Sequence, residues 1–294
     1  MRIALPTCSN LPEWEVDDGA LHAALANRSV DVERPVWDDS NIDWSRYRAC
    51  LIRTTWDYQE KREAFVAWAQ RVAEQTTLFN PCSIVEWNTH KSYLRDLEQR
   101  GVPVTPTVWL NPGESVDLSG ILSERGWQRA FLKPAIGATA RETLRFEATP
   151  TGLADAEQHL HRMLQTETML LQPYWSSVET RGELSAIFVD GRITHAVRKV
   201  PVRGDYRVQD DFGGSDELVT LSDHEVALAR RCMAAVEPDG QGPLLYGRVD
   251  FLFDDDGGLR LSELELVEPS LFFRHCPTAA DALAEALCRR LGEA

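Results

Sequence analysis

The chain has 294 residues, of which 43% are hydrophobic and 26% charged, as expected of a globular protein with two or three subdomains. Its formal net charge of −15 argues against nucleic acid and acidic membranes as partners, because neither polyanion is attracted to such a surface. No stretch is apolar enough for a membrane span and the N-terminus lacks a signal-peptide pattern, so we expect a cytoplasmic protein.

The first 75 residues alternate predicted strands and helices. We expect strands at 2–6 and 49–53 and helices at 18–27 and 60–75. This alternation is typical of a small parallel α/β domain. Arg53, Thr55 and Asp57 follow the second strand, at the end of a parallel sheet where ligands usually bind. They are candidate substrate contacts, or else part of a capping box that leads into the next helix.

The rest of the chain mixes strands and helices. A helix at 91–100 would begin at a cap formed by Asn88 or Thr89 and end at Gly101, and 112–125 should be a loop with a short helix. The Asp190-Gly191 pair predicts the turn of a hairpin over 183–202. The other expected strands are 130–136, 142–148 and 168–175, and the other expected helices are 153–165, 224–236 and 279–291.

A second predicted hairpin, at 246–270, carries the most informative pattern. Arg248 and Asp250 share one face of its first strand, and Glu263 and Glu265 share one face of its second strand. Three carboxylates and the Arg248 guanidinium should therefore converge, and the carboxylates would repel one another unless a cation lay between them. Carboxylate oxygens suit Mg²⁺ or Mn²⁺. An acidic surface rim is the alternative, but Glu263 and Glu265 stand in an otherwise apolar strand, which favours a metal and phosphate site.

The order of these features from about 88 to 273 resembles the ATP-grasp carboxylate-amine ligases. The match is clearest in GRVDF and LSELELVEPS, which are similar to the signature strands of D-alanine:D-alanine ligases. The resemblance implies an α/β (α+β) chain with the ATP-grasp fold. It further implies an N-terminal α/β domain at 1–90, a lid subdomain at 91–173 and a C-terminal ATP-grasp subdomain with the metal-binding hairpin at 174–294.

The resemblance also implies a set of ATP-binding residues. Lys91 and Lys133 stand where the superfamily places two phosphate-binding lysines, and Glu183 stands at the position of its ribose-binding acid, with Glu179 as a close competitor. The lid loop 134–140 departs from the pattern, because it lacks most of the glycines whose amides cradle phosphates. The remaining implied ATP contacts are Gly137, Thr139, Leu171, Gln172, Pro173, Tyr174 and Lys199.

On the same resemblance, Asp250, Glu263 and Glu265 would hold two Mg²⁺ ions that bridge the ATP phosphates, and Arg248 would be the catalytic residue that stabilises the transferring phosphoryl group. Glu265 is a departure, because many family members have an asparagine at this position. The additional negative charge would tighten metal binding or favour a different ion.

Within the superfamily, LIRTTWDY, NPCSIVEWNTHKSYL, LLQPYW and LELVEPSLF are most similar to a small bacterial group that includes the cyclo-ligase forming D-cycloserine from O-ureido-D-serine. This implies a ligase that phosphorylates a carboxylate and lets a nitrogen of the same molecule attack it, in antibiotic biosynthesis. Arg203, Arg207 and Ser270 would face the small, amino-acid-like substrate. A glutathione-synthetase-like or dipeptide ligase and a non-catalytic nucleotide-binding regulator are the alternatives, and both a monomer and a homo-oligomer are compatible with the sequence.

Overall fold

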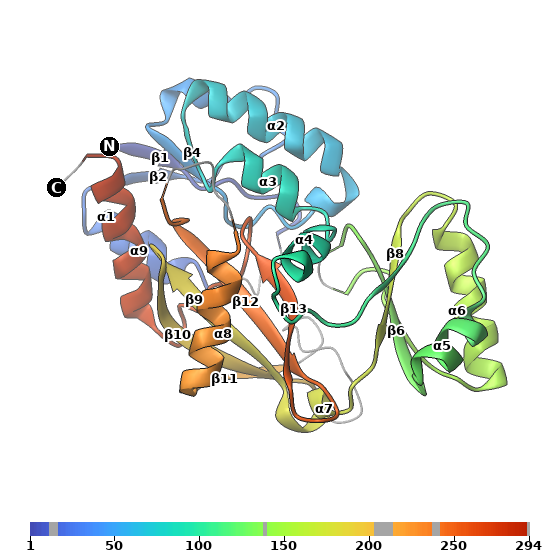
Figure 1. Cartoon of the computed structure of the whole chain (residues 1–294). Helices are drawn as coiled ribbons and strands as arrows, with labels where there is room; N and C mark the ends of the chain where they lie inside the picture. Colours follow the sequence, from blue (N-terminus) through green and yellow to red (C-terminus); the bar gives the residue numbers. More distant parts are fainter. Residues whose placement is uncertain (12–16, 138–139, 203–213, 237–241, 293–294) are drawn as a thin grey trace.

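The computed structural model describes residues 1–11, 17–137, 140–202, 214–236 and 242–292. Within these ranges the chain forms three sheets, one parallel and two antiparallel (Figure 1). This mixture of parallel and antiparallel sheets with helices confirms the predicted α+β class. None of the described helices is both long and apolar enough to pass through a lipid bilayer.

The first sheet is parallel, with strand order β2-β1-β3-β4. Its strands are β1 (Arg2–Ala4), β2 (Asp31–Glu33), β3 (Ala49–Leu51) and β4 (Thr77–Phe79), and its main helices are α1 (Gly19–Ala26) and α2 (Arg62–Gln75). Side chains alternate across it: Ile3 packs toward α1, whereas Ala4 packs toward α2. Both predicted strands are present. β2 and β4 have three residues each, too few to show a periodic pattern.

The second sheet has strand order β5-β8-β6-β7 and is antiparallel. Its strands are β5 (Val108–Leu110), β6 (Arg129–Pro134), β7 (Leu144–Glu147) and β8 (Met169–Pro173). Helices α5 (Leu118–Arg125) and α6 (Pro150–Met163) cover one face, on the right in Figure 1. The short helix expected within 112–125 is α5, which Asp117 caps by accepting from the Gly120 amide at 2.9 Å.

The third sheet has strand order β11-β10-β9-β12-β13, with every neighbouring pair antiparallel. Both predicted hairpins are present, and Asp190 and Gly191 have the positive φ angles that a two-residue turn requires. The strands are β9 (Glu183–Val189), β10 (Arg192–Val200), β11 (Ser215–Val219), β12 (Tyr246–Phe253) and β13 (Leu259–Glu265), and the accompanying helices are α7 (Ser177–Arg181), α8 (Asp223–Ala234) and α9 (Pro277–Arg290).

The link between the first two sheets differs from the prediction. Asn88 and Thr89 do not cap a following helix, because α3 (Cys82–Asn88) ends there and α4 (Tyr93–Gln99) begins after Ser92. The division at 90 and 173 remains a prediction. One hydrophobic core, which includes Ile3, Ile187 and Leu283, joins the first sheet, the third sheet and α9.

Candidate active site

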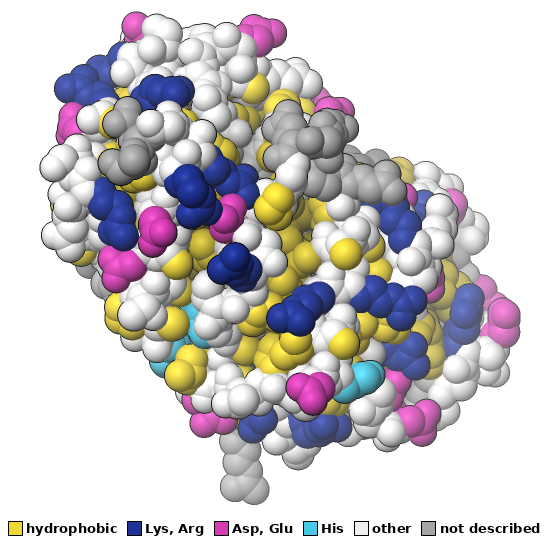
Figure 2. Space-filling view, turned by 60° about the vertical axis from the view of Figure 1, so that its left-hand side comes forward, with side chains coloured by type: hydrophobic (Ala, Val, Ile, Leu, Met, Phe, Trp, Pro, Cys, Tyr) yellow, Lys and Arg dark blue, Asp and Glu magenta, His cyan; other side chains and the backbone are white. Residues whose placement is uncertain are grey.

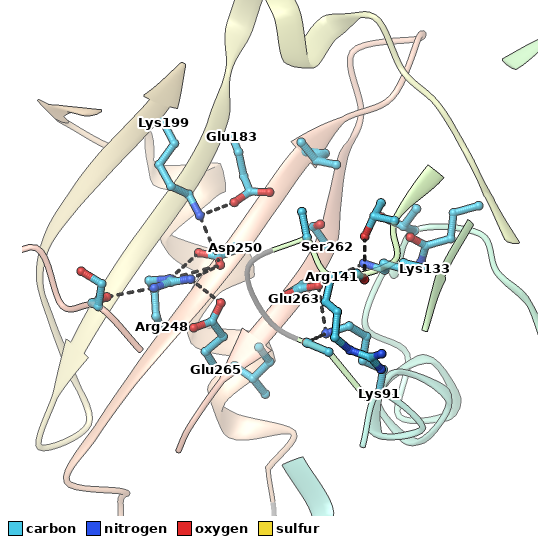
Figure 3. A pocket seen from close by; sticks show the side chains of 18 of the residues that line it. Lys91, Lys133, Arg141, Glu183, Lys199, Arg248, Asp250, Ser262, Glu263 and Glu265 are labelled. Carbon is cyan, nitrogen blue, oxygen red and sulfur yellow. Dashed lines mark hydrogen bonds and ion pairs between the residues drawn. The ribbon is translucent and has the colours of Figure 1, made fainter. Parts of the chain in front are cut away.

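A pocket of about 560 Å³ is lined by residues of the second and third sheets and of the N-terminal region. Phe131 and Gln172 contribute from the second sheet, Leu252 and Ser262 from the third, and Trp56 from the segment after β3. Despite the net charge of −15, Figure 2 shows lysine and arginine side chains around a hydrophobic region on one face of the molecule. In the pocket itself, ten of the lining residues are labelled in Figure 3, and most of the charged ones among them belong to two groups.

The first group surrounds Asp250 on β12. Arg248 Nε donates to both Asp250 oxygens at 3.0 and 3.1 Å, and Arg248 Nη2 forms an ion pair with Glu265. Lys199 Nζ lies 3.4 Å from Asp250 Oδ2 and pairs with Glu183 (Figure 3). Burial by itself would lower the pKa of Arg248, but Asp250 and Glu265 outweigh it and raise the pKa above its ordinary value. Arg248 therefore stays charged.

The second group surrounds Glu263 on β13. Its Oε1 lies 3.2 Å from Lys91 Nζ and 3.1 Å from Lys133 Nζ (Figure 3). Burial would raise the pKa of Glu263, but the two ammonium groups outweigh it and hold the pKa well below its usual range. The same burial lowers the pKa of Lys133. Two lysines from different parts of the chain therefore meet at one carboxylate, in an arrangement that suits a phosphate.

Glu265 behaves differently from Glu263. Burial raises the pKa of Glu265 to about 7 even though Arg248 favours its charged form, and Asp250 and Glu263 raise it further. Its side chain is still 29% exposed, on the pocket side. An additional cation in the pocket would therefore relieve a charge that the protein neutralises only in part.

The three carboxylates and the guanidinium that the sequence places together, those of Asp250, Glu263, Glu265 and Arg248, all line this pocket. Each carboxylate is paired with a cation: Glu263 with Lys91 and Lys133, and both Asp250 and Glu265 with Arg248. Within the described ranges, no cluster of three or more His, Cys, Asp or Glu side chains is close enough to hold a metal ion as it stands. The three side chains are nevertheless oxygen donors of the kind that Mg²⁺ takes, so a metal fits here once ion pairs to Lys91, Lys133 or Arg248 rearrange.

Strand β13 is held in place by side chains as well as by β12. Asn88 donates to the Leu264 carbonyl and accepts from the Leu266 amide, both at 2.8 Å, and the Tyr93 hydroxyl accepts from the Leu264 amide at 3.1 Å. These contacts take the place of a neighbouring strand and fix the direction of Glu263 and Glu265. The sequence predicted Asn88 only as a helix cap.

The residues after Lys133 that the resemblance implies as ATP contacts differ in whether their side chains line the pocket. Gln172, Pro173 and Tyr174 line the pocket, whereas the side chain of Leu171 is fully buried in the core of the second sheet. Gly137 also lines it, but its carbonyl accepts from Lys91 Nζ at 3.0 Å.

Glu183 and Glu179, the two candidates for the ribose-binding acid, differ in their position relative to the pocket. Glu183 lines the pocket together with Lys199, whereas Glu179 is not among the lining residues and binds the Tyr174 hydroxyl and Arg145. Thr139, a further implied ATP contact, lies outside the described residues.

The expected substrate contacts after β3 are corrected. Arg53 is 2% exposed, forms an ion pair with Asp18 at 2.8 Å and donates to the Pro269 carbonyl at 2.9 Å. Thr55 is fully buried, and Asp57 accepts from Trp37 Nε1 at 2.7 Å. None of the three is on the pocket wall, which this segment lines instead with Trp56 and Tyr58.

The remaining predicted substrate contacts lie in the segment after β13 and in the segment before β11. Ser270 lines the pocket, and its carbonyl accepts from Arg248 Nη1 at 3.0 Å. Arg203 and Arg207 lie outside the described residues.

Several pocket residues were not predicted from the sequence. Asp17 accepts from the Leu271 amide, and Arg274 pairs with Asp17 and with Asp216. Glu268 belongs to the LSELELVEPS motif and lines the pocket, but the sequence predicted no role for it. The other unassigned pocket residues that carry a charge are Arg141, Asp216 and Arg274.

The chain matches known proteins over nearly its whole length. Residues 3–80 match the N-terminal domain of D-cycloserine synthetase DcsG, and residues 118–255 match the ATP-grasp domain of prokaryotic glutathione synthetase. The chain is 34% identical to the cycloserine biosynthesis protein DcsG of Streptomyces lavendulae over 285 residues, which are 90% of this chain and 91% of that protein. The chain belongs to the DcsG family of ATP-grasp ligases.

Solved structures agree with this membership. The crystal structure of D-cycloserine synthetase DcsG matches with a TM-score of 0.89 and 30% identity, over 99% of this chain and 100% of that one. A D-alanine–D-alanine ligase from Bacillus anthracis matches with a TM-score of 0.73, 14% identity and coverage of 99% and 97%, a likeness of fold alone. The predicted ATP-grasp fold and ligase class are thereby confirmed, and the family implies the use of ATP and a divalent metal.

Proposed function

We propose that this DcsG-family ligase closes the ring of D-cycloserine from O-ureido-D-serine. ATP would phosphorylate the carboxylate of the substrate, and the nitrogen bound to the side-chain oxygen would then attack the acyl phosphate. That nitrogen also carries a carbamoyl group that the product lacks, so one water molecule is needed to remove it in a separate step. Because both reacting groups belong to one molecule, the site must only fold the substrate onto itself.

The observation that carries this proposal is that the charge groups around Asp250 and around Glu263 line one pocket. Lys91 and Lys133 would hold phosphate oxygens, while Glu183 would hold the ribose and the segment 172–174 at the end of β8 would hold the base. Arg248, held by Asp250 and the Ser270 carbonyl, would stabilise the phosphoryl group during transfer.

We further propose that Asp250, Glu263 and Glu265 hold two Mg²⁺ ions, with Mn²⁺ as a substitute. Bound there, the metal would neutralise phosphate charge during the transfer. In addition, Glu265 in place of the common asparagine would make metal affinity depend on its ionisation. We also propose that the protein acts in the cytoplasm on one small, amino-acid-like substrate. It would not bind nucleic acid.

The test is product analysis with a single amino acid present. The purified protein with MgATP and O-ureido-D-serine should form ADP and D-cycloserine without any second amine. ADP formation that requires a second amino acid would instead identify a dipeptide or glutathione-type ligase. An absence of turnover across a panel of amino acids would favour a non-catalytic nucleotide-binding protein.

A further inference from the structure

Glu268 is set apart from the other acidic residues of the pocket. Within the part of the chain that the structure describes, seven acidic side chains line the pocket, and six of them form an ion pair with a lysine or arginine. No such ion pair to Glu268 is found among the described residues. Its neighbour is an uncharged donor, the hydroxyl of Tyr58. Among the described residues, Glu268 is therefore the pocket carboxylate without an ion pair to a lysine or arginine.

The backbone around Glu268 is held firmly. Trp56 Nε1 donates to the Glu268 carbonyl at 3.1 Å, and Arg53 Nη2 donates to the Pro269 carbonyl at 2.9 Å. Arg248 Nη1 donates to the Ser270 carbonyl at 3.0 Å, and Asp17 accepts from the Leu271 amide at 3.1 Å. Side chains from the N-terminal region thus fix this short segment next to the phosphate-binding groups, which is the support that a reacting group requires.

The proposed ring closure needs a proton acceptor. The attacking nitrogen lies between an oxygen and a carbonyl carbon, so its lone pair is delocalised and it is a weak nucleophile while it keeps its proton. The lysines and Arg248 are cationic and cannot accept that proton, and Asp250 and Glu263 are committed to cations. Glu268 is the uncommitted oxygen base in the described part of the pocket.

We propose, resting on the function above, that the Glu268 carboxylate takes the proton from the nitrogen that attacks the acyl phosphate. In this step the nitrogen–carbon bond forms, the bond between that carbon and the phosphate oxygen breaks, and phosphate leaves with the electron pair. The proton passes from nitrogen to Glu268 Oε, so atoms and charge balance. Tyr58, which lines the same pocket and whose hydroxyl favours the charged form of Glu268, acts as a positioning residue.

The electrostatics fit this role. Burial raises the pKa of Glu268 to about 8, and Glu265 adds to the increase, while Tyr58 and Lys91 oppose it. A base with a pKa close to the working pH both accepts and returns a proton efficiently, and general base catalysis typically contributes about 10²–10⁴-fold.

The test separates the two chemical steps. Glu268→Gln has the same shape and should still phosphorylate the substrate, so hydroxylamine added to the reaction should trap the acyl phosphate as a hydroxamate at a rate within about threefold of wild type. D-Cycloserine formation should fall about 10²-fold or more in kcat. Glu217→Gln, at an exposed position on β11, is the matched control and should leave both rates unchanged.

Three outcomes would overturn the proposal. These are cyclisation by Glu268→Gln at close to the wild-type rate, loss of the hydroxamate in parallel with the product, or a change in KM alone. The last outcome would make Glu268 a binding residue. If the wild-type protein yields neither ADP nor hydroxamate from O-ureido-D-serine, the proposed function itself fails, and this inference fails with it.

Tyr58→Phe supplies an independent readout. Removing the hydroxyl takes away a contact that lowers the pKa of Glu268, so the rise of kcat with pH should move to higher pH. Merely structural damage would lower kcat without moving the profile. An unmoved profile in Tyr58→Phe would count against the base assignment.

Discussion

Arg248 and Asp250 stand two residues apart on β12, and the guanidinium of Arg248 donates to both carboxylate oxygens of Asp250 at 2.9 to 3.1 Å. Both side chains are buried. The same guanidinium also donates to Glu265 and to the Ser270 carbonyl. These contacts fix the orientation of the Arg248 guanidinium before any ligand binds. Electrostatic preorganisation of a phosphoryl-stabilising arginine requires such a fixed orientation.

Arg248→Ala should abolish turnover. Loss of a transition-state arginine costs about 10³-fold or more in kcat in related phosphoryl transfers. ATP binding should persist, because the proposed base and ribose contacts lie on β8 and at Glu183. Kinetics of ADP release and nucleotide titration check this. Arg260→Ala, on the same hairpin but paired with Asp254 in the turn, is the control and should retain activity.

Glu263→Gln should weaken Mg²⁺-dependent nucleotide binding by at least about tenfold, or ~1.4 kcal/mol. The amide loses the charge that a metal needs, and Lys91 and Lys133 lose their common partner. Calorimetric titration with and without Mg²⁺ separates the two effects, because only the metal-dependent part should fall. Equal affinities of wild type and variant in Mg²⁺ would contradict the metal assignment.

Asn88→Ala should destabilise the fold and lower activity together. The Leu264 carbonyl and the Leu266 amide would be left unpaired in a buried position, at about 1–3 kcal/mol for each group. Urea unfolding without nucleotide measures the loss. Asn41→Ala, at an exposed position, should leave the free energy of unfolding nearly unchanged. Unaltered stability in Asn88→Ala would show that β13 does not depend on this contact.

The ligand-free protein should lose stability as pH rises through 7 and 8. Burial raises the pKa of Glu265 to about 7 and of Glu268 to about 8, from an ordinary 4.5. A raised pKa means that the folded state holds the proton more tightly, so the stabilisation is complete below the ordinary value and disappears above the raised one.

The comparison with Glu268→Gln isolates one of these two groups. Urea unfolding in EDTA should show the variant gaining stability relative to wild type as pH rises from 6 to 9, since the glutamine never ionises. A stability difference between the two proteins that stays constant with pH would contradict the raised pKa of Glu268.

Patterns within single elements predicted much of the fold. The alternation on β12 correctly placed Arg248 beside Asp250. Asp190-Gly191 marked the turn between β9 and β10, because few other dipeptides accept two positive φ angles. The three-residue strands β2, β4 and β5 were missed, since pairing partners rather than sequence period define them.

The parts of the site that long-range contacts create could not be read from the sequence. The expected metal cluster neglected Lys91 and Lys133, which neutralise Glu263 from other parts of the chain. The position of Arg53 at the end of a parallel strand suggested a ligand contact, but its guanidinium forms a buried ion pair with Asp18. Glu268 stood out only once the ion pairs of the pocket were known.

The central claim is that one substrate molecule supplies both the phosphorylated carboxylate and the attacking nitrogen. The most direct measurement uses O-ureido-D-serine with ¹⁸O in its carboxylate as the only amino acid, with MgATP. We predict one ¹⁸O transferred to inorganic phosphate for each D-cycloserine formed. Phosphate without ¹⁸O, or product that forms only when a second amine is added, would contradict it.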